Sequence, residues 1–582
     1  MALFEKKHTN KVLLDDTETL TSVIENARTI DGHTEYVIRT QRGPLPEKSW
    51  RVSRRYNDFV QLNGVLSASG LDLPLPPKKI IGNMDVEFIS QRQIALQNYL
   101  NVVLMNPILA SSLPMKHFLD PNNYAIPLHE IALQQVSLAL RSDANFEIGK
   151  PIADMGWRLR KHYYTVKNRQ NVKQELLLAW VEFGPDKHLH DRDIHGVFKS
   201  LVTLKHHCIE SIVHQHVSEN GALTIRNFYS NGTLRDVLCN SKPKQPFIKK
   251  YGNPKQPKSL TTSEIATYAY QILEALSYLA EKGLPYGHLH TGNVLITPTG
   301  AKLLDIENGL LGLPAFYRPY VVQRRKLHAT TQVDVYSFGH VLYEMAFGRP
   351  LLEATCTDIP CCDVHLKNLL EVILSPEALK QDLPTIPRLI EHPFFENPRR
   401  ASALSAGSIE KPHFKLSSHL KDALLEAANK AEQRLRDEQK VVRHQKRLVK
   451  VQELMSSEEE MKKRKQKLKK ETKLAQEQQS SQLAASEVKQ INGKSPERSD
   501  SPTSTSTTTS VGTFTPPSHG FTKISSNATS VKNNEKNNVP FTEASSGAVD
   551  TPSSGANDRS ALLGSICNFN KAKLRKITNG NN

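Results

Sequence analysis

The chain has 582 residues, 38% of them hydrophobic, and carries a formal net charge of +17 at pH 7. At roughly 100–200 residues per domain, this length has room for two or three folded domains. The positive charge favours acidic partners, without choosing among anionic lipid headgroups, nucleic acid and an acidic protein face. The sequence has no apolar run near the ~18–20 residues of a membrane span, no apolar signal-peptide core, and no C-x-x-C pair among its six cysteines. We therefore expect a cytoplasmic protein whose membrane contacts are peripheral.

Residues 10–122 form the first predicted domain. Strand-like runs at 35–40 and 49–54 are followed by a proline-rich loop at 74–77 and a helical pattern from about 85 to 104. Cationic side chains stand at the end of a strand, in the loop and on the helix, so they can converge on one anionic group, which arginine binds through two parallel hydrogen bonds. Taken singly, each of these residues could equally be a solvated surface charge.

The order and spacing of Arg-Arg-Tyr-Asn-Asp-Phe at 54–59, Leu-Pro-Leu-Pro-Pro-Lys-Lys at 73–79 and Arg-Gln-Ile-Ala-Leu at 92–96 resemble the PX (phox homology) family. The resemblance implies a three-stranded antiparallel sheet with helices. It also implies that Arg55 binds the 3-phosphate of a phosphoinositide, that Tyr56 stacks on the inositol ring, that Lys78 contacts the 1-phosphate and that Arg92 binds the ring hydroxyls. Phosphatidylinositol 3-phosphate is the expected ligand, which points to early endosomes, with the plasma membrane as a second site.

Residues 150–400 resemble the protein kinase family. The strings that carry this resemblance are the hinge-like 223–234, Asp-Val-Tyr-Ser-Phe-Gly at 334–339, and Leu-Pro-Thr at 383–385 followed by His-Pro-Phe-Phe at 392–395. The resemblance implies a bilobal fold. Phosphoryl transfer depends on positioned charges more than on covalent chemistry, so its loss or retention should be readable in a small set of residues.

Most of that set has changed. The loop at 153–160 has one glycine instead of a glycine-rich pattern, Trp180 stands where the strand lysine is expected, and Val197 stands where the helix glutamate is expected. In the segment that resembles the catalytic loop, His288 replaces the catalytic aspartate and His290 replaces a lysine.

The two residues that match the family's metal ligands remain, namely Asn293 and Asp305, although Asp305 is followed by Ile-Glu instead of Phe-Gly. They predict weak binding of Mg-ATP at best, and no required cofactor. We therefore expect a pseudokinase. The alternative is a divergent active serine/threonine kinase on endosomes, because His288 could accept a proton.

Residues 416–478 are predicted to form a charged helix whose run at 461–470 has seven basic residues in ten. Such a run is a solvated helix face, a nuclear signal or a contact to acidic lipid. It lacks interleaved aromatics, so we expect no nucleic-acid partner. Residues 479–556 are rich in Ser, Thr, Asn and Pro, a composition that predicts disorder.

The C-terminal segment at 558–578 places apolar residues at helical spacing, which is typical of a helix that binds in a groove. It resembles the WASP-homology-2 motif, which implies monomeric actin as the partner. The implied contact residues are Leu562, Leu563, Ile566, Leu574, Arg575 and Lys576. The other reading is a tail helix that packs on its own kinase-like domain.

Together these segments predict a multidomain α+β protein: a PX fold, a bilobal kinase-like fold, a charged helix and a disordered tail. The predicted function is a membrane-trafficking or signalling scaffold with an unidentified protein partner at the kinase-like domain. A purely cargo-sorting PX protein is a third reading, which depends on whether the central domain binds any partner by itself.

Overall fold

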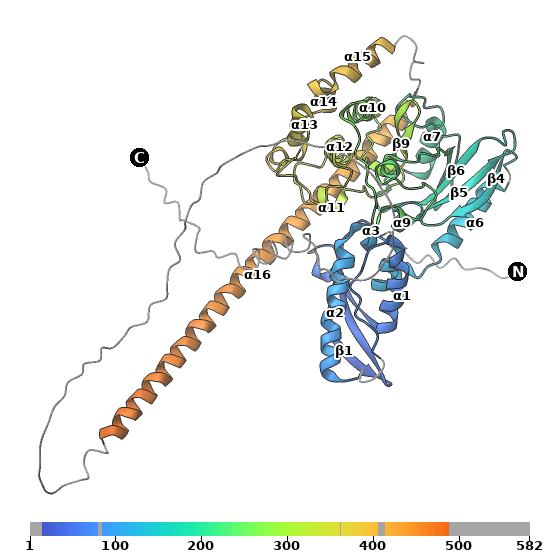
Figure 1. The fold of residues 1–582 in the computed structure, drawn as a ribbon. Helices are drawn as coiled ribbons and strands as arrows, with labels where there is room; N and C mark the ends of the chain where they lie inside the picture. Colours follow the sequence, from blue (N-terminus) through green and yellow to red (C-terminus); the bar gives the residue numbers. More distant parts are fainter. Residues whose placement is uncertain (1–13, 80–83, 142, 361–362, 406–413, 488–582) are drawn as a thin grey trace, which may run out of the picture. The chain divides into compact units, whose positions relative to one another are not determined.

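The computed structural model describes residues 14–79, 84–141, 143–360, 363–405 and 414–487. The first domain contains an antiparallel sheet in the order β1-β2-β3 (Figure 1). Its strands are β1 (Leu20–Ile30), β2 (His33–Arg42) and β3 (Ser49–Arg55). The start of β1 alternates buried and exposed residues, as expected for a sheet with one covered face.

Six helices complete this part of the chain. They are α1 (Tyr56–Leu66), α2 (Val86–Met105), α3 (Pro107–Ala110), α4 (Leu113–Leu119), α5 (Pro121–Tyr124) and α6 (Leu128–Leu140). The core of the domain lies between the sheet and helices α1, α2 and α4, with Phe59 in contact with the rings of Tyr36, Tyr99 and Phe118. The three-stranded sheet with helices predicted from the sequence is confirmed.

The central domain begins with a five-stranded antiparallel sheet in the order β4-β5-β6-β8-β7. The strands are β4 (Phe146–Ile152), β5 (Lys161–Asn168), β6 (Glu175–Glu182), β7 (His214–Val217) and β8 (Gly221–Asn227). Helix α7 (Asp191–Leu201) packs into the main core through its apolar side, and α6 covers the other face of the sheet. The sheet therefore has two buried faces, one of which borders the cleft between this sheet and residues 290–305.

The second lobe is mainly helical. Its elements are α8 (Leu234–Leu238), α9 (Phe247–Tyr251), α10 (Thr262–Glu281), β9 (Val294–Thr297), β10 (Gly300–Leu303), α11 (Arg318–Val321), α12 (Thr330–Phe347), α13 (Val364–Leu374), α14 (Ile386–Ile390) and α15 (Glu396–Ser405). Helix α12 contains the Asp-Val-Tyr-Ser-Phe-Gly string at 334–339 on which the kinase resemblance rests. Helix α10 starts at a capping box in which Thr261 and Glu264 satisfy each other's backbone N–H groups. The predicted bilobal kinase-like architecture is confirmed.

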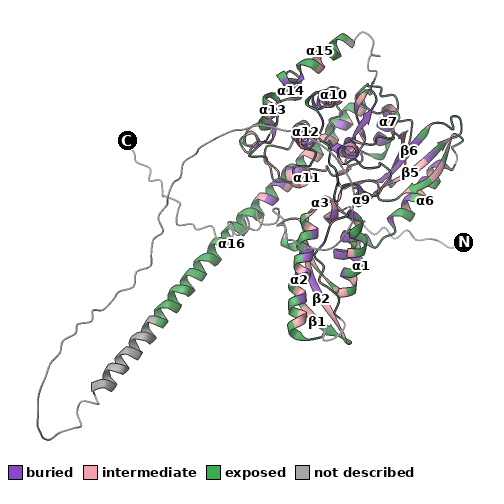
Figure 2. Cartoon of the chain, viewed as in Figure 1, coloured by how far each residue is buried: buried purple, intermediate pink, exposed green. Residues whose placement is uncertain are grey.

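Helix α16 (Ser418–Glu487) runs past the expected end at 478 and has two different parts. In its first part, Leu424 and Leu435 join the core of the kinase-like domain, as does Phe414 just before it. Further along, Leu448, Leu454 and Met461 are 44–59% exposed. Figure 2 shows this change from buried to exposed along the helix. The central domain therefore includes residues beyond the predicted limit of 400.

Within the described residues, no helix combines the length and the apolar character that a membrane crossing requires. The predicted actin-binding residues at 562–576 and nearly all of the predicted disordered segment lie outside the described residues.

Candidate functional site

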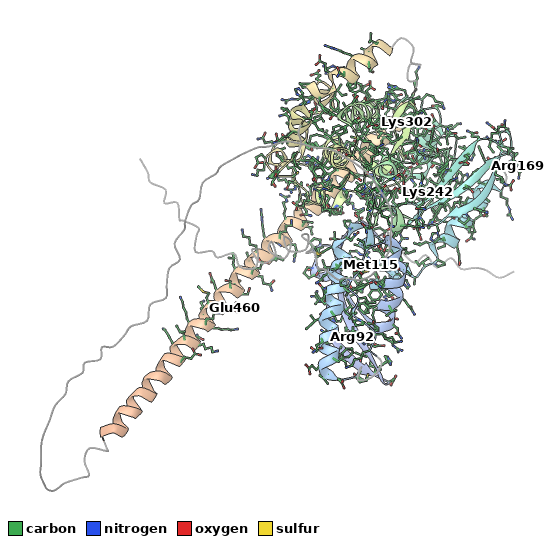
Figure 3. The ribbon with its side chains drawn as sticks, in the orientation of Figure 1. Arg92, Met115, Arg169, Lys242, Lys302 and Glu460 are labelled. Atoms are coloured by element: carbon green, nitrogen blue, oxygen red, sulfur yellow. The ribbon has the colours of Figure 1, made fainter. Side chains whose placement is uncertain are left out.

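Four predicted lipid-binding residues stand at or near one corner of the first domain. Tyr56 opens α1, and its hydroxyl donates to the carbonyl of Pro76 at 2.5 Å. Arg92 lies on α2 of the first domain (Figure 3). Its guanidinium donates to the carbonyl of Pro77 at 3.2 Å and lies 4.2 Å from the centre of the Tyr56 ring. The proline loop is thus held against both side chains, as a preformed site requires.

The two arginines of this corner differ in their surroundings. Arg92 is 8% exposed, and its Nε atom has no hydrogen-bond partner among the described residues. The side chain of Arg55, at the end of β3, is 54% exposed, and its Nε lies 3.5 Å from Oε1 of Glu35. Lys78 is exposed on the loop after the prolines. The structure therefore joins Tyr56 and Arg92 directly and leaves Arg55 and Lys78 at the surface.

The cleft of the central domain contains a buried ion pair that the sequence did not predict. Lys161, the first residue of β5, places its Nζ 2.6 Å from Oδ2 of Asp305. Although burial raises the pKa of Asp305, Lys161 and Arg226 lower it to about 2, so the carboxylate is ionised at neutral pH. Asp305 has a φ of 57°, in the left-handed region. Such strain in a non-glycine residue is commonly retained at functional sites.

Lys161 occupies the cleft from the strand next to the one on which a lysine was expected. The expectation that Trp180 fills the lysine position is wrong, because Trp180 packs on the opposite face of the sheet with Val136 of α6. Residues Leu177 and Ala179 of the same strand line the cleft instead. Successive side chains of a strand point to opposite faces, so an error of one residue changes the face.

Val197 of α7, which the sequence alignment places at the position of the family's helix glutamate, packs in the apolar core. A buried ion pair from other elements lies at the back of the cleft. Arg226 of β8 donates to Glu307 with 2.6 Å between Nη2 and Oε2, and both side chains are buried. Glu307 stands at the position of the missing glycine after Asp305. Two new charges therefore satisfy each other within the cleft.

The segment that resembles a catalytic loop keeps part of its geometry. The side-chain amide of Asn293 donates to the carbonyl of His288 at 3.0 Å. The imidazole of His288 accepts at Nδ1 from the guanidinium of Arg158 at 3.3 Å. Burial and the neighbouring Arg158 charge hold the pKa of His288 well below 6.5. His288 is therefore neutral, and its single acceptor nitrogen is in use.

Aromatic and cationic side chains from the loop at 153–160 reach across the cleft. Trp157 lies edge-on to the rings of His290 and Phe316, and Arg158 donates to the carbonyl of Pro314 at 2.8 Å. The remaining cavity measures about 120 Å³. Small-molecule sites usually measure roughly 300–1,000 Å³. The cavity is therefore smaller than a usual small-molecule site, and Trp157 and Arg158 of the loop at 153–160 are among the residues that line it.

A second cluster of possible metal ligands follows α7. The ligand atoms of His206, His207 and Cys208 lie within 4.8 Å of one another. His206 Nδ1 already accepts from the backbone N–H of Cys208 at 3.1 Å, and His207 Nε2 lies 3.3 Å from Glu274 of α10. Burial, with the nearby Glu274 charge, raises the pKa of the Cys208 thiol. These contacts account for the cluster as a hydrogen-bonded turn that is tied to α10.

Known proteins share both parts of this architecture. Residues 45–122 match the model of the PX domain, and residues 166–311 match that of "Protein tyrosine and serine/threonine kinase". The PX domain-containing protein kinase-like protein of Mus musculus is 47% identical over 451 residues, which cover 77% of this chain and 76% of the mouse protein. The chain belongs to the family of PX domain-containing protein kinase-like proteins.

Two further relatives match shorter parts. The "Probable inactive serine/threonine-protein kinase slob1" of Dictyostelium discoideum is 33% identical over 288 residues, covering 44% of this chain and 48% of the relative. The "Slowpoke-binding protein" of Drosophila melanogaster is 36% identical over 166 residues, covering 27% and 32%. The PX domain and the kinase-like domain predicted from the sequence are thus confirmed.

Sequence reasoning missed three residues of the kinase-like cleft: Lys161, Arg226 and Arg158. Lys161 could have been predicted from its position directly after the loop at 153–160, because the residue that begins the next strand lies beside the cleft. No such signal marked Arg226, because its partner Glu307 lies 81 positions away.

Proposed function

We propose that this protein is a non-catalytic scaffold that its PX domain recruits to phosphoinositide-bearing membranes. The observation that carries the non-catalytic part is at His288. A neutral imidazole has one acceptor nitrogen, and in His288 that nitrogen binds Arg158. Protonation of His288 would also place two positive charges in contact inside the protein. The group at the catalytic position is therefore unsuited to accept the proton of a substrate hydroxyl.

The lipid-binding part is supported by the donors that the PX corner leaves unused. The buried Nε of Arg92 lacks an acceptor among the described residues, and buried donors are rarely left unpaired. The Arg55 side chain is more than half exposed, and its guanidinium lies at a long distance of 3.5 Å from the Glu35 carboxylate. An anionic headgroup would satisfy both. Phosphatidylinositol 3-phosphate is the favoured ligand, which would place the protein on early endosomes in membrane trafficking or signalling, with the plasma membrane as a second site.

Vesicle flotation with the full chain tests this proposal. We expect Arg55→Ala to weaken binding to vesicles that contain phosphatidylinositol 3-phosphate by about 10- to 100-fold, the loss of one charge-assisted hydrogen bond. Arg51→Ala is the matched control, since Arg51 is an exposed arginine on the same strand and pairs with Glu25 outside this corner. If Arg55→Ala floats like the wild type, the lipid assignment is wrong.

The kinase-like domain is the proposed protein-binding platform. A domain with an impaired site and an intact fold retains surfaces for partners, and one relative of this domain is named for binding Slowpoke. We infer that this chain binds a protein partner through its kinase-like domain.

Nucleotide binding without transfer is a second candidate function, favoured by the ionised Asp305 beside Lys161 and by the retained Asn293. Both Asn293 and Asp305 offer oxygen atoms, the ligands that Mg²⁺ prefers. The test is Mg-ATP binding and labelled-phosphate transfer by the full chain, with Asp305→Asn and Lys161→Met as variants. Transfer that vanishes in both variants would make this an active kinase and overturn the scaffold proposal; binding without transfer supports a structural nucleotide.

The C-terminal tail is proposed to bind monomeric actin through the WASP-homology-2-like segment. A peptide of residues 555–582 should slow actin polymerisation, and Leu563→Asp should abolish the effect because an apolar anchor is lost. Identical polymerisation curves with peptide and with buffer would reject this part alone.

A further inference from the structure

Helix α16 covers an apolar surface of the kinase-like domain beside the segment that resembles a catalytic loop. A cavity of about 160 Å³ lies beneath it, lined by residues 283–288, by parts of 306–315 and by Leu424, Ala428 and Leu435 of the helix. The activation segment from Asp305 to Tyr317 is short, and the small and apolar side chains of α16 border the space next to it. The helix thus completes the core of the domain at this place.

The contacts of α16 reach both lobes. Leu420 lies against α7, where a Cβ added to Gly196 would meet its Cδ2 at 3.2 Å. Arg434 donates to the carbonyl of Pro185 at 2.5 Å and pairs with Asp186 at 2.6 Å, in the loop between β6 and α7. On the other lobe, Glu432 accepts from the backbone N–H of Thr330 at 3.0 Å. One helix therefore spans the junction of the two lobes.

Gln439 is the deepest polar contact of this helix. It is 2% exposed, and its Nε2 lies 3.1, 2.8 and 2.8 Å from the carbonyls of Val321, Arg324 and Leu327. These carbonyls lie in and after the short helix α11, whose last carbonyl groups need donors from outside the helix. The side-chain amide of Gln439 shares its two N–H groups among these carbonyls, two of which also accept a backbone N–H group, and so ties the segment at 321–327 to α16.

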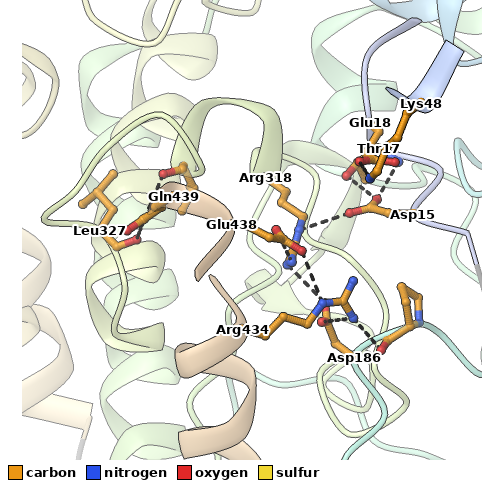
Figure 4. Close-up of polar contacts among 12 residues, drawn as sticks. Asp15, Thr17, Glu18, Lys48, Asp186, Arg318, Leu327, Arg434, Glu438 and Gln439 are labelled. Atoms are coloured by element: carbon orange, nitrogen blue, oxygen red, sulfur yellow. Dashed lines mark hydrogen bonds and ion pairs between the residues drawn. The ribbon is translucent and has the colours of Figure 1, made fainter. Parts of the chain in front are cut away.

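Arg318 joins this arrangement to the segment that enters the PX domain. Its guanidinium contacts Asp186 of the first lobe at 3.1 Å, Glu438 of α16 at 2.7 Å and Asp15 at 3.1 Å (Figure 4). The Arg318 side chain is 11% exposed. Separating any one of the three carboxylates from Arg318 is costly, because it leaves buried charge without its partner.

We propose that residues 418–446 of α16 act as an intramolecular strap, which fixes α7 against the second lobe and closes the surface beside residues 283–288. The Arg318 ion pairs link the strap to residues 14–19, so that local unfolding of either segment destabilises the other. The occupant of this surface is the protein's own helix. An external partner of the kinase-like domain binds elsewhere or displaces the strap.

Hydrogen–deuterium exchange of the full chain tests the strap. Gln439→Met keeps the length and helix propensity of the side chain and removes the donors to the three carbonyls. We expect exchange in α7 and in 283–289 and 306–316 to quicken about two- to ten-fold, the factor for one net hydrogen bond. Leu435→Glu should have a larger effect. Leu454→Glu, on the exposed part of the same helix, is the matched control and should change nothing in these segments.

Two outcomes would overturn the proposal. The strap is wrong if Gln439→Met quickens exchange in α16 and leaves α7 and 283–289 as in the wild type. The tie to the PX side is tested by Arg318→Met, which should quicken exchange in both 14–19 and 418–446. A change in only one of these segments would show that the junction does not couple them. The PX sheet at 20–42, which has its own core, serves as the internal reference against general unfolding.

Discussion

At the scale of single residues, the kinase-like domain holds a buried histidine whose ring lies among tyrosines. His340 of α12 is 1% exposed, and its ring stacks on Tyr317 and Tyr320 with centroids 4.4 and 5.6 Å apart. Neither ring nitrogen has a hydrogen-bond partner among the described residues. Burial lowers the pKa of His340 to about 3, so the ring is neutral and carries an unsatisfied N–H group.

His340→Phe should stabilise the protein for this reason. The variant keeps an aromatic ring between the tyrosines and removes a buried polar group whose desolvation costs about 1–3 kcal/mol. We expect the free energy of unfolding to rise within that range, measured by urea titration. His216→Phe, on an exposed position of β7, is the control and should change stability little. Equal or lower stability of His340→Phe would show that the ring nitrogens are satisfied after all.

At the scale of elements, the segment after β6 (184–187) crosses the activation segment at 311–312 in direct backbone contact. The backbone N–H of Gly184, after β6, donates to the carbonyl of Leu311 at 2.8 Å, and the backbone N–H of Asp186 donates to the carbonyl of Gly312 at 3.0 Å. A Cβ on Gly312 would lie 1.9 Å from the backbone nitrogen of Lys187, and its φ is +70°. The activation segment is therefore pinned to the first lobe through a backbone contact that only glycine permits.

Comparing Gly312→Ala with Gly283→Ala separates the cost of a positive φ from the cost of a steric clash between the two backbone segments. Both glycines have positive φ, and an added Cβ at Gly283 meets nothing within 4 Å. Gly283→Ala should cost about 1–2 kcal/mol, the penalty for a left-handed alanine. Gly312→Ala should cost at least about 2 kcal/mol more because the segments must separate. Urea midpoints of the two variants give the comparison; equal losses would mean that the crossing relaxes freely.

The sequence was sufficient to predict elements that have a local residue pattern. It was not sufficient for residues whose position depends on a partner far away in the chain. The string at 334–339 and the apolar spacing around it were sufficient to place α12. Trp180 was assigned to the wrong face because strand register against β5 is not visible in one sequence. Lys161 and Arg226 were missed because their partners come from a segment more than 80 positions later.

Four buried histidines and the partly exposed His206 give the whole molecule a common response to acid. Burial lowers the pKa of His162 and His206 to about 4 and that of His340 to about 3, and it holds those of His288 and His290 well below 6.5. In the unfolded chain each histidine titrates near 6.5. The unfolded state therefore binds more protons below that pH, and the stabilisation present above pH 6.5 is lost as the pH falls towards the lowered folded values.

The free energy of unfolding should consequently fall between pH 7 and pH 5. Each histidine contributes up to about 1.4 kcal/mol per pH unit below 6.5. Urea unfolding followed by tryptophan fluorescence, which reports on Trp157 and Trp180 of the kinase-like domain, measures the change. The slope should be smaller in His340→Phe. Stability that stays level or rises on acidification would contradict the neutral state of these rings.

The docking of α16 also changes how sequence differences between individuals or species should be weighed. If residues 418–478 were a fully solvated helix, substitutions at 424, 435 or 439 would be harmless. These positions behave instead as interior positions of a domain whose other residues end near 405. Natural variation should therefore be sparse along one side of the helix up to about residue 442 and plentiful around Glu460, which lies on the exposed part.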